Sequence, residues 1–181
     1  MTDRPAPTLI YVEHVLWTPG AEWRRALEHL AERFRRVAPL DVDAVLAAGA
    51  LHQQLAALAA WAAEPKADID RELGRFLDEH LSMHVRPDAA VTRAIRAQAA
   101  LGPVHAVSAL PPRPAESIAR HGGAWRSFEQ LYAGVLDADA LQQVIEETGA
   151  EVLVVGGDTP VPTELPEGLR IAGDVAALAS A

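Results

Sequence analysis

Tyr11, Glu13 and His14 bring a phenol, a carboxylate and an imidazole within four positions of one another in an otherwise apolar stretch, residues 8–17. This stretch is rich in residues that favour strands, and Thr18-Pro19-Gly20 after it is typical of a turn and a helix start. It predicts a buried central strand. Ligands of open α/β sheets bind at the carboxyl ends of such strands, so these three side chains mark where we expect a site.

Spacing alone does not make Glu13 and His14 an acid–base pair, because neighbouring residues of a strand point to opposite faces of the sheet. Glu13 is equally explained as a polar residue at the end of a strand. Tyr11 is explained as core packing with its hydroxyl group on a hydrogen-bond partner. The decisive observation would be whether Glu13 and His14 reach one cavity.

Two more polar side chains follow short apolar stretches. Ser108 lies in the predicted strand 104–110, and the proline-rich residues 111–114 then lead into a helix whose amino end could help the Ser108 hydroxyl to hold an anion. Asp158 follows the predicted strand 152–155 and two glycines. Its carboxylate is either a turn residue or a weak candidate ligand for a metal ion such as Mg²⁺.

Apolar periodicity and breaking residues predict the elements around these positions. Four helices are expected between the first two strands. The first is capped by Thr18 and ended by Pro39, and the second runs from Asp41 or Asp43 to about Ala63 with Gly49 as a weak point. The third follows Asp68, and the fourth ends at Gly102. Beyond the second strand we expect a helix closed by Gly122-Gly123, a short strand or loop at 127–133, a helix from Asp137 to Gly149, strands 152–155 and 169–172, and a last helix capped by Asp174.

Strands that alternate with helices predict a three-layer, Rossmann-like α/β fold with a parallel sheet and right-handed crossovers. The helices between residues 20 and 86 are too many for one crossover and predict an inserted helical cap. We therefore expect a core of residues 1–19 and 87–181 and a cap of residues 20–86. Much of the cap is alanine, which suits close helix packing and makes a homodimer plausible.

The composition excludes several classes of function. The chain has 25 acidic and 16 basic residues among 181, a net charge of −9, which argues against a nucleic-acid or anionic-membrane surface. It has no cysteine, and hence no disulfide or thiolate site. There is neither a signal-peptide pattern nor an apolar run of roughly 18 residues, so we expect a cytoplasmic protein.

The chain resembles the haloacid dehalogenase (HAD)-like hydrolases along nearly its whole length. Their first strand carries a nucleophilic Asp, a second Asp that acts as general acid/base, and then a glycine. In residues 10–16 here, Tyr11 falls on the nucleophile, Glu13 on the acid/base and His14 on the glycine. Ser108 matches the family's phosphoryl-binding Ser or Thr, and Gly157-Asp158 resembles its Gly-Asp pair, whose acidic groups hold Mg²⁺.

Three departures bear on the activity that the resemblance implies. A phenol with a pKa near 10 is a poor replacement for a nucleophilic carboxylate. The lysine that would balance charge before the last motif is absent, since residues 134–151 contain neither Lys nor Arg. The second acidic residue expected soon after Asp158 is also missing, because residues 159–163 contain none.

Our first hypothesis is a catalytically degenerate, non-hydrolytic binding or regulatory protein. Its anionic small-molecule pocket would lie between cap and core and would be lined by Tyr11, Glu13, His14, Ser108 and Asp158. The alternative is a hydrolase or lyase with altered chemistry, in which Glu13 or His14 acts as general base on a small phosphorylated or acidic substrate. A third hypothesis is a structural partner for another protein.

Overall fold

The fold was analysed in a computed structural model that describes residues 6–84, 86–157 and 159–173, without the side chains of 82–84. Its sheet has five parallel strands in the order β3 (Gln130–Ala133), β2 (Val104–Ser108), β1 (Thr8–Tyr11), β4 (Val152–Val154) and β5 (Arg170–Ala172). The apolar run at the start of the chain therefore forms the central strand, as predicted. Within the described ranges, no helix is long and apolar enough to cross a membrane.

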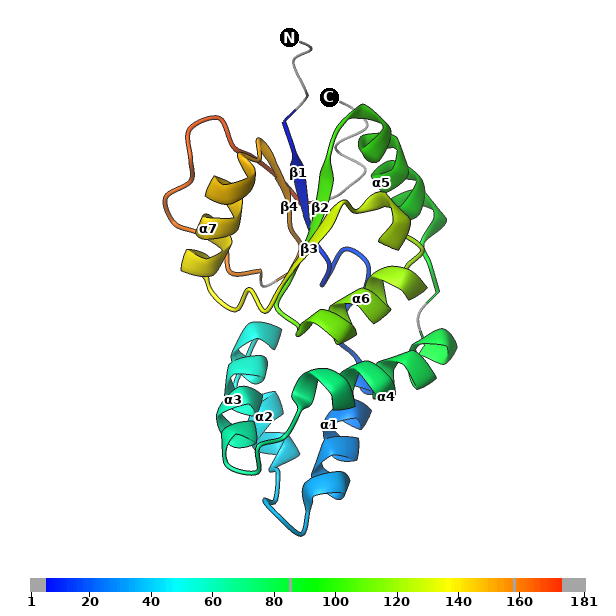
Figure 1. Cartoon of the computed structure of the whole chain (residues 1–181), viewed down its shortest axis with the longest axis vertical. Coiled ribbons are helices and arrows are strands. Elements are labelled where there is room, and N and C mark those ends of the chain that lie inside the picture. Colours follow the sequence, from blue (N-terminus) through cyan, green and yellow to red (C-terminus); the bar gives the residue numbers. More distant parts are fainter. Residues whose placement is uncertain (1–5, 85, 158, 174–181) are drawn as a thin grey trace.

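Helices cover both faces of the sheet (Figure 1). On one side lie α5 (Ala89–Leu101) and α6 (Pro112–His121), joined to β3 through the short 3₁₀ helix η1 (Trp125–Ser127); α7 (Ala138–Thr148) lies on the other side. Ile10 of β1 packs with Ile95 of α5, whereas its neighbour Leu9 belongs to the cluster that contains Leu141 of α7. This alternation confirms the predicted three-layer α/β architecture.

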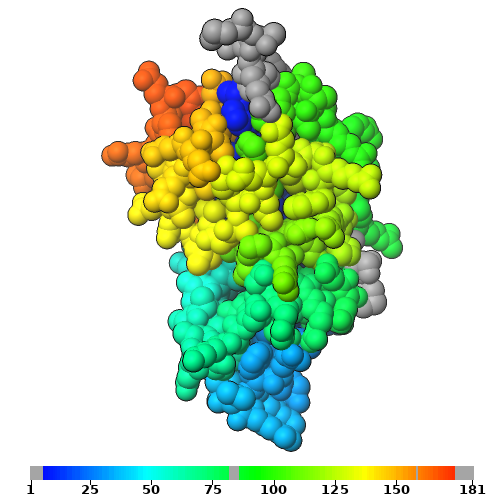
Figure 2. Space-filling model, viewed as in Figure 1, coloured from blue at the N-terminus to red at the C-terminus, as the bar shows by residue number. Residues whose placement is uncertain are grey.

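Four more helices pack on one another beyond the carboxyl ends of the strands: α1 (Ala21–Phe34), α2 (Val42–Ala47), α3 (Leu51–Ala63) and α4 (Ile69–His84). They occupy the part of the chain where the sequence predicts the cap, and we call them the helical unit. The exact division at residues 19/20 and 86/87 stays a prediction. In the space-filling view, the surface of α4 adjoins that of α6 (Figure 2).

Several predicted element boundaries are wrong, and three of them concern the first strand and the helical unit. The first strand ends at Tyr11 and does not continue to residue 17. Gly20, not Thr18, precedes the first turn of α1. The helix expected up to Ala63 is two helices, because Gly49 between them has a φ of +116°, a conformation that glycine adopts without strain. The helix predicted after Asp174 lies outside the described residues.

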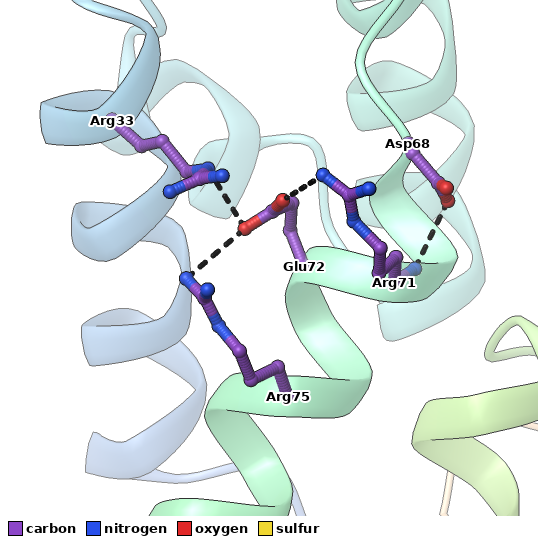
Figure 3. A network of polar contacts seen from close by, with 5 residues as sticks. All are labelled: Arg33, Asp68, Arg71, Glu72 and Arg75. Carbon is purple, nitrogen blue, oxygen red and sulfur yellow. Dashed lines mark hydrogen bonds and ion pairs between the residues drawn. The ribbon is translucent and has the colours of Figure 1, made fainter.

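A buried carboxylate joins α1 to α4 within the helical unit (Figure 3). The side chain of Glu72 on α4 is 2% exposed and pairs with Arg33 of α1 at 2.8 Å, and with Arg71 and Arg75 of its own helix at 3.0 and 3.3 Å. A buried charge is costly unless it is paired, and here the guanidinium groups supply the pairing. Because Arg33 comes from the neighbouring helix, the network fixes how α1 lies against α4.

The helical unit meets the core along α4 and α6. Gly74 of α4 lies against Arg113 of α6, and Asp70 accepts a hydrogen bond from the backbone N–H of Arg113 at 2.8 Å. The Ser117 hydroxyl donates to the Asp78 carboxylate one turn further along each helix. Polar contacts and close packing thus hold the two helices side by side over the first half of α6.

We expect Gly74→Ala to destabilise the protein. A Cβ atom on Gly74 would lie 2.7 Å from the Cβ of Arg113, closer than carbon atoms normally approach. Overpacking of this kind costs about 1–3 kcal/mol, although alanine at a free helical position would stabilise by about 1 kcal/mol. Urea unfolding should therefore show a lower free energy of unfolding for Gly74→Ala and little change for the exposed Glu79→Ala on the same helix. A Gly74→Ala variant as stable as the wild type would show that α4 and α6 are not closely packed.

Candidate functional site

The chain leaves the sheet directly after Tyr11 and turns back on itself. The N–H of Val12 still donates to the Val107 carbonyl of β2, but His14 has a φ of +67° and its N–H donates to the carbonyl of Trp17. The alternation expected of a strand therefore does not extend to Glu13 and His14. Contrary to our expectation of opposite faces, both side chains line one cavity.

The Tyr11 phenol is part of the core. Its side chain is 2% exposed, and its hydroxyl group donates to the carbonyl of Val135 at 2.9 Å. Burial raises the pKa of this phenol well above its ordinary value, and the nearby Glu13 carboxylate raises it further. A neutral phenol whose proton is engaged by a carbonyl is a hydrogen-bond donor, not a nucleophile.

The Glu13 carboxyl group is buried between β1 and β2. The residue is 1% exposed, and its Oε1 accepts hydrogen bonds from the Ser108 hydroxyl at 2.6 Å and from the Leu110 N–H at 3.2 Å. Its Oε2 has no hydrogen-bond partner among the residues described. Burial raises the pKa of Glu13, while the hydrogen bonds from Ser108 and from nearby backbone N–H groups act in the opposite direction.

The donors predicted to hold an anion after β2 are already engaged by side chains of the protein itself. The Ser108 hydroxyl donates to Glu13, the Leu110 N–H is shared between Glu13 and the Ser108 Oγ, and the Arg113 N–H donates to Asp70. The other residues of the segment that opens α6 are prolines at 111, 112 and 114, which have no N–H to offer. An incoming phosphate or carboxylate would have to displace these two carboxyl groups.

His14 fits its position because two glycines lie beside it. A Cβ atom on Gly157 would come within 2.6 Å of the His14 ring nitrogen Nδ1, and one on Gly156 would come within 2.9 Å of the His14 Cβ. The loop after β4 thus provides the space that the imidazole needs. His14 stands where the resembling family has glycine, and its left-handed backbone is one that glycine adopts readily.

The cavity at this end of β1 is small. Its volume is about 10 Å³, and its wall comprises Tyr11, Glu13, His14, Leu51, His52, Ala109, Thr159 and Pro160. That volume holds about one water molecule, so a substrate needs the helical unit or the 159–160 loop to move away. His52 was not predicted to lie at this site. It reaches the cavity because a new helix, α3, begins after Gly49, and this glycine was the signal in the sequence that could have placed it.

The described residues around this cavity offer few ligands for Mg²⁺. Mg²⁺ needs several oxygen ligands in near-octahedral geometry, and the carboxyl group that lines this cavity is that of Glu13. Within the described parts of the chain, no group of three His, Asp or Glu side chains is placed to hold a metal ion. Asp158, the predicted candidate for ligand and metal binding, lies outside the described residues.

The raised pKa of Glu13 predicts how stability depends on pH. The folded protein keeps this proton to higher pH than the unfolded chain, which releases it near pH 4.3. The contribution of Glu13 is therefore fully present below about pH 4.3 and is lost as the pH rises through the folded-state pKa. Glu13→Gln cannot ionise, so urea unfolding should favour the variant over the wild type increasingly as the pH rises from about 4.5 toward the folded-state pKa of Glu13. The exposed Glu28→Gln is the control; if Glu13→Gln shows the same pH dependence as this control, the pKa of Glu13 is not raised.

Comparison with known proteins supports the fold. No model of a known protein family matches the chain, and no curated protein has a significant sequence match. Among solved structures, one described as a predicted phosphoglycolate phosphatase from Haemophilus somnus is 13% identical, with 96% of each chain covered and a TM-score of 0.51. The structure of a HAD-like hydrolase from Xanthomonas campestris also matches, with 16% identity, coverage of 97% of this chain and 94% of that chain, and a TM-score of 0.48. A HAD-like hydrolase from Streptococcus pneumoniae matches with 11% identity, coverage of 87% of this chain and 78% of that chain, and a TM-score of 0.46. The chain has the HAD-like α/β fold that its sequence resemblance implied.

Proposed function

We propose that this HAD-like protein is a non-hydrolytic binding or regulatory protein. The observation that carries the proposal is that the Glu13 carboxyl group accepts hydrogen bonds from the Ser108 hydroxyl and the Leu110 N–H. A phosphoryl-transfer or dehalogenation site needs free donors for the charge of the substrate. Here the protein's own carboxyl group occupies them, in a cavity with room for about one water molecule.

Two further features support this proposal. Tyr11, the residue at the nucleophile position, donates its hydroxyl proton to the Val135 carbonyl in a hydrogen bond, and the pKa of its phenol is raised. The lysine that the family places before its last motif has no counterpart in residues 134–151. Each feature removes a different requirement of covalent catalysis, the nucleophile in one case and the charge balance in the other. The anionic or protein ligand, the homodimer and the cytoplasmic location stay predictions.

A second function, hydrolysis or elimination with altered chemistry, is favoured by one observation. Glu13 and His14 line the same cavity, and Oε2 of Glu13 has no partner within the described residues. A buried carboxyl group with a raised pKa is suited to general acid/base catalysis near neutral pH. In this case Glu13 would exchange a proton with a bound substrate, and no covalent intermediate on Tyr11 would form.

Turnover of small phosphate esters and 2-haloacids, with and without Mg²⁺, separates the two functions. We expect the wild type, Glu13→Gln and Tyr11→Phe to have the same negligible rate, because no nucleophile is available. All three proteins must be folded, as judged by their thermal unfolding.

A wild-type rate that Glu13→Gln lowers by about 100-fold or more and Tyr11→Phe leaves in place would contradict the proposal. Such a result would assign acid/base catalysis to Glu13. A rate lost in Tyr11→Phe as well would indicate covalent catalysis by the phenol.

A further inference from the structure

Four arginines and a tryptophan line two adjoining hollows on the face of the molecule that carries α5, α6 and η1. One hollow, of about 460 Å³, is lined by Arg96, Arg120, Gly123, Trp125 and Arg126. The other, of about 470 Å³, adds Arg93 and again contains Arg96 and Gly123. The shared residues make the hollows neighbours, and no Asp or Glu lines either of them.

Three of these arginines have no carboxylate partner among the residues that the structure describes. Arginines elsewhere on the helices commonly pair with carboxylates, as seen for Arg24, Arg33, Arg35, Arg71, Arg75 and Arg113. In the hollows, Arg120 pairs with Glu116, but Arg93, Arg96 and Arg126 have no carboxylate partner within the described ranges. Three guanidinium groups without a carboxylate partner in the described residues thus line neighbouring hollows, in a protein whose net charge is −9.

Contacts with the backbone and with Trp125 orient two of the cations. The Arg96 guanidinium donates to the Gly123 carbonyl at 3.5 Å, at the junction of the two hollows. The Arg120 guanidinium lies over the Trp125 ring, 5.8 Å from its centre. Trp125 is only half-buried, so part of its indole ring is left to form the wall of the first hollow.

We propose that these hollows form a binding site for a compact phosphorylated ligand that also carries a ring, such as a nucleoside diphosphate. Guanidinium groups bind phosphate oxygens bidentately, and an indole ring provides a stacking surface for a base. Each hollow has the volume of a small-molecule site. The net charge of −9 disfavours a long nucleic acid, which rewards positive charge over an extended surface. The site lies apart from Glu13 and does not depend on the function of the strand-end cavity.

Isothermal titration calorimetry with adenosine diphosphate and with inorganic pyrophosphate, without divalent cations, tests the proposal. The wild type should bind both, with the nucleotide tighter because its base stacks on Trp125. The double variant Arg93→Gln/Arg126→Gln should bind both ligands at least about tenfold more weakly. Arg24→Gln/Arg35→Gln makes the same change of charge on exposed arginines of the helical unit and should bind as the wild type does.

The Trp125→Leu variant distinguishes the contribution of base stacking to the affinity from that of phosphate binding. It should reduce the affinity for the nucleotide to that for pyrophosphate and leave pyrophosphate binding unchanged; thermal unfolding checks that each variant is folded. The proposal is overturned if the wild type binds neither ligand at millimolar concentration, or if the two double variants weaken binding equally. It is also overturned if an acidic peptide binds at the arginines while both phosphate compounds do not.

Discussion

The hydrogen bonds that the Glu13 carboxyl group accepts from Ser108 and Leu110 are the interaction on which the strand-end site depends. They join the turn after β1 to the end of β2, and they place a titratable group where the fold otherwise presents donors to a ligand. Burial of this group raises its pKa, and the hydrogen bonds from Ser108 and Leu110 act in the opposite direction. The same contact therefore ties the turn to β2 and places the Glu13 carboxyl group in the wall of the cavity.

Packing of the helical unit on the core limits access to this site. Asp70 of α4 accepts a hydrogen bond from the Arg113 N–H, and Gly74 lies against that arginine. Leu51 and His52 of α3 cover the cavity. A ligand larger than a water molecule would have to displace part of this cover or the loop of Thr159 and Pro160.

The sequence predicted the sheet and its helices because buried strands and amphipathic helices leave a direct periodic signal. Asp137 caps α7, and Gly149 ends α7 with a φ of +64°, each as residue type predicts. The site could be located but not described. The left-handed turn at His14 depends on the distant glycines 156 and 157, and the Glu13–Ser108 hydrogen bond joins residues 95 positions apart, so no local pattern encodes either.

Phosphate binding to Glu13→Ala, beside Glu13→Gln and the wild type, tests most directly whether Glu13 occupies an anion site. Removing the carboxyl group frees the Ser108 hydroxyl proton and leaves the Leu110 N–H on the Ser108 Oγ at 3.1 Å, whereas glutamine keeps an acceptor oxygen of the same size in place. We expect Glu13→Ala to bind inorganic phosphate at least about tenfold more tightly than Glu13→Gln and the wild type do. Adding Ser108→Ala to Glu13→Ala should abolish this gain in affinity. Equal phosphate binding by Glu13→Ala and the wild type would show that no anion site lies beneath the carboxyl group.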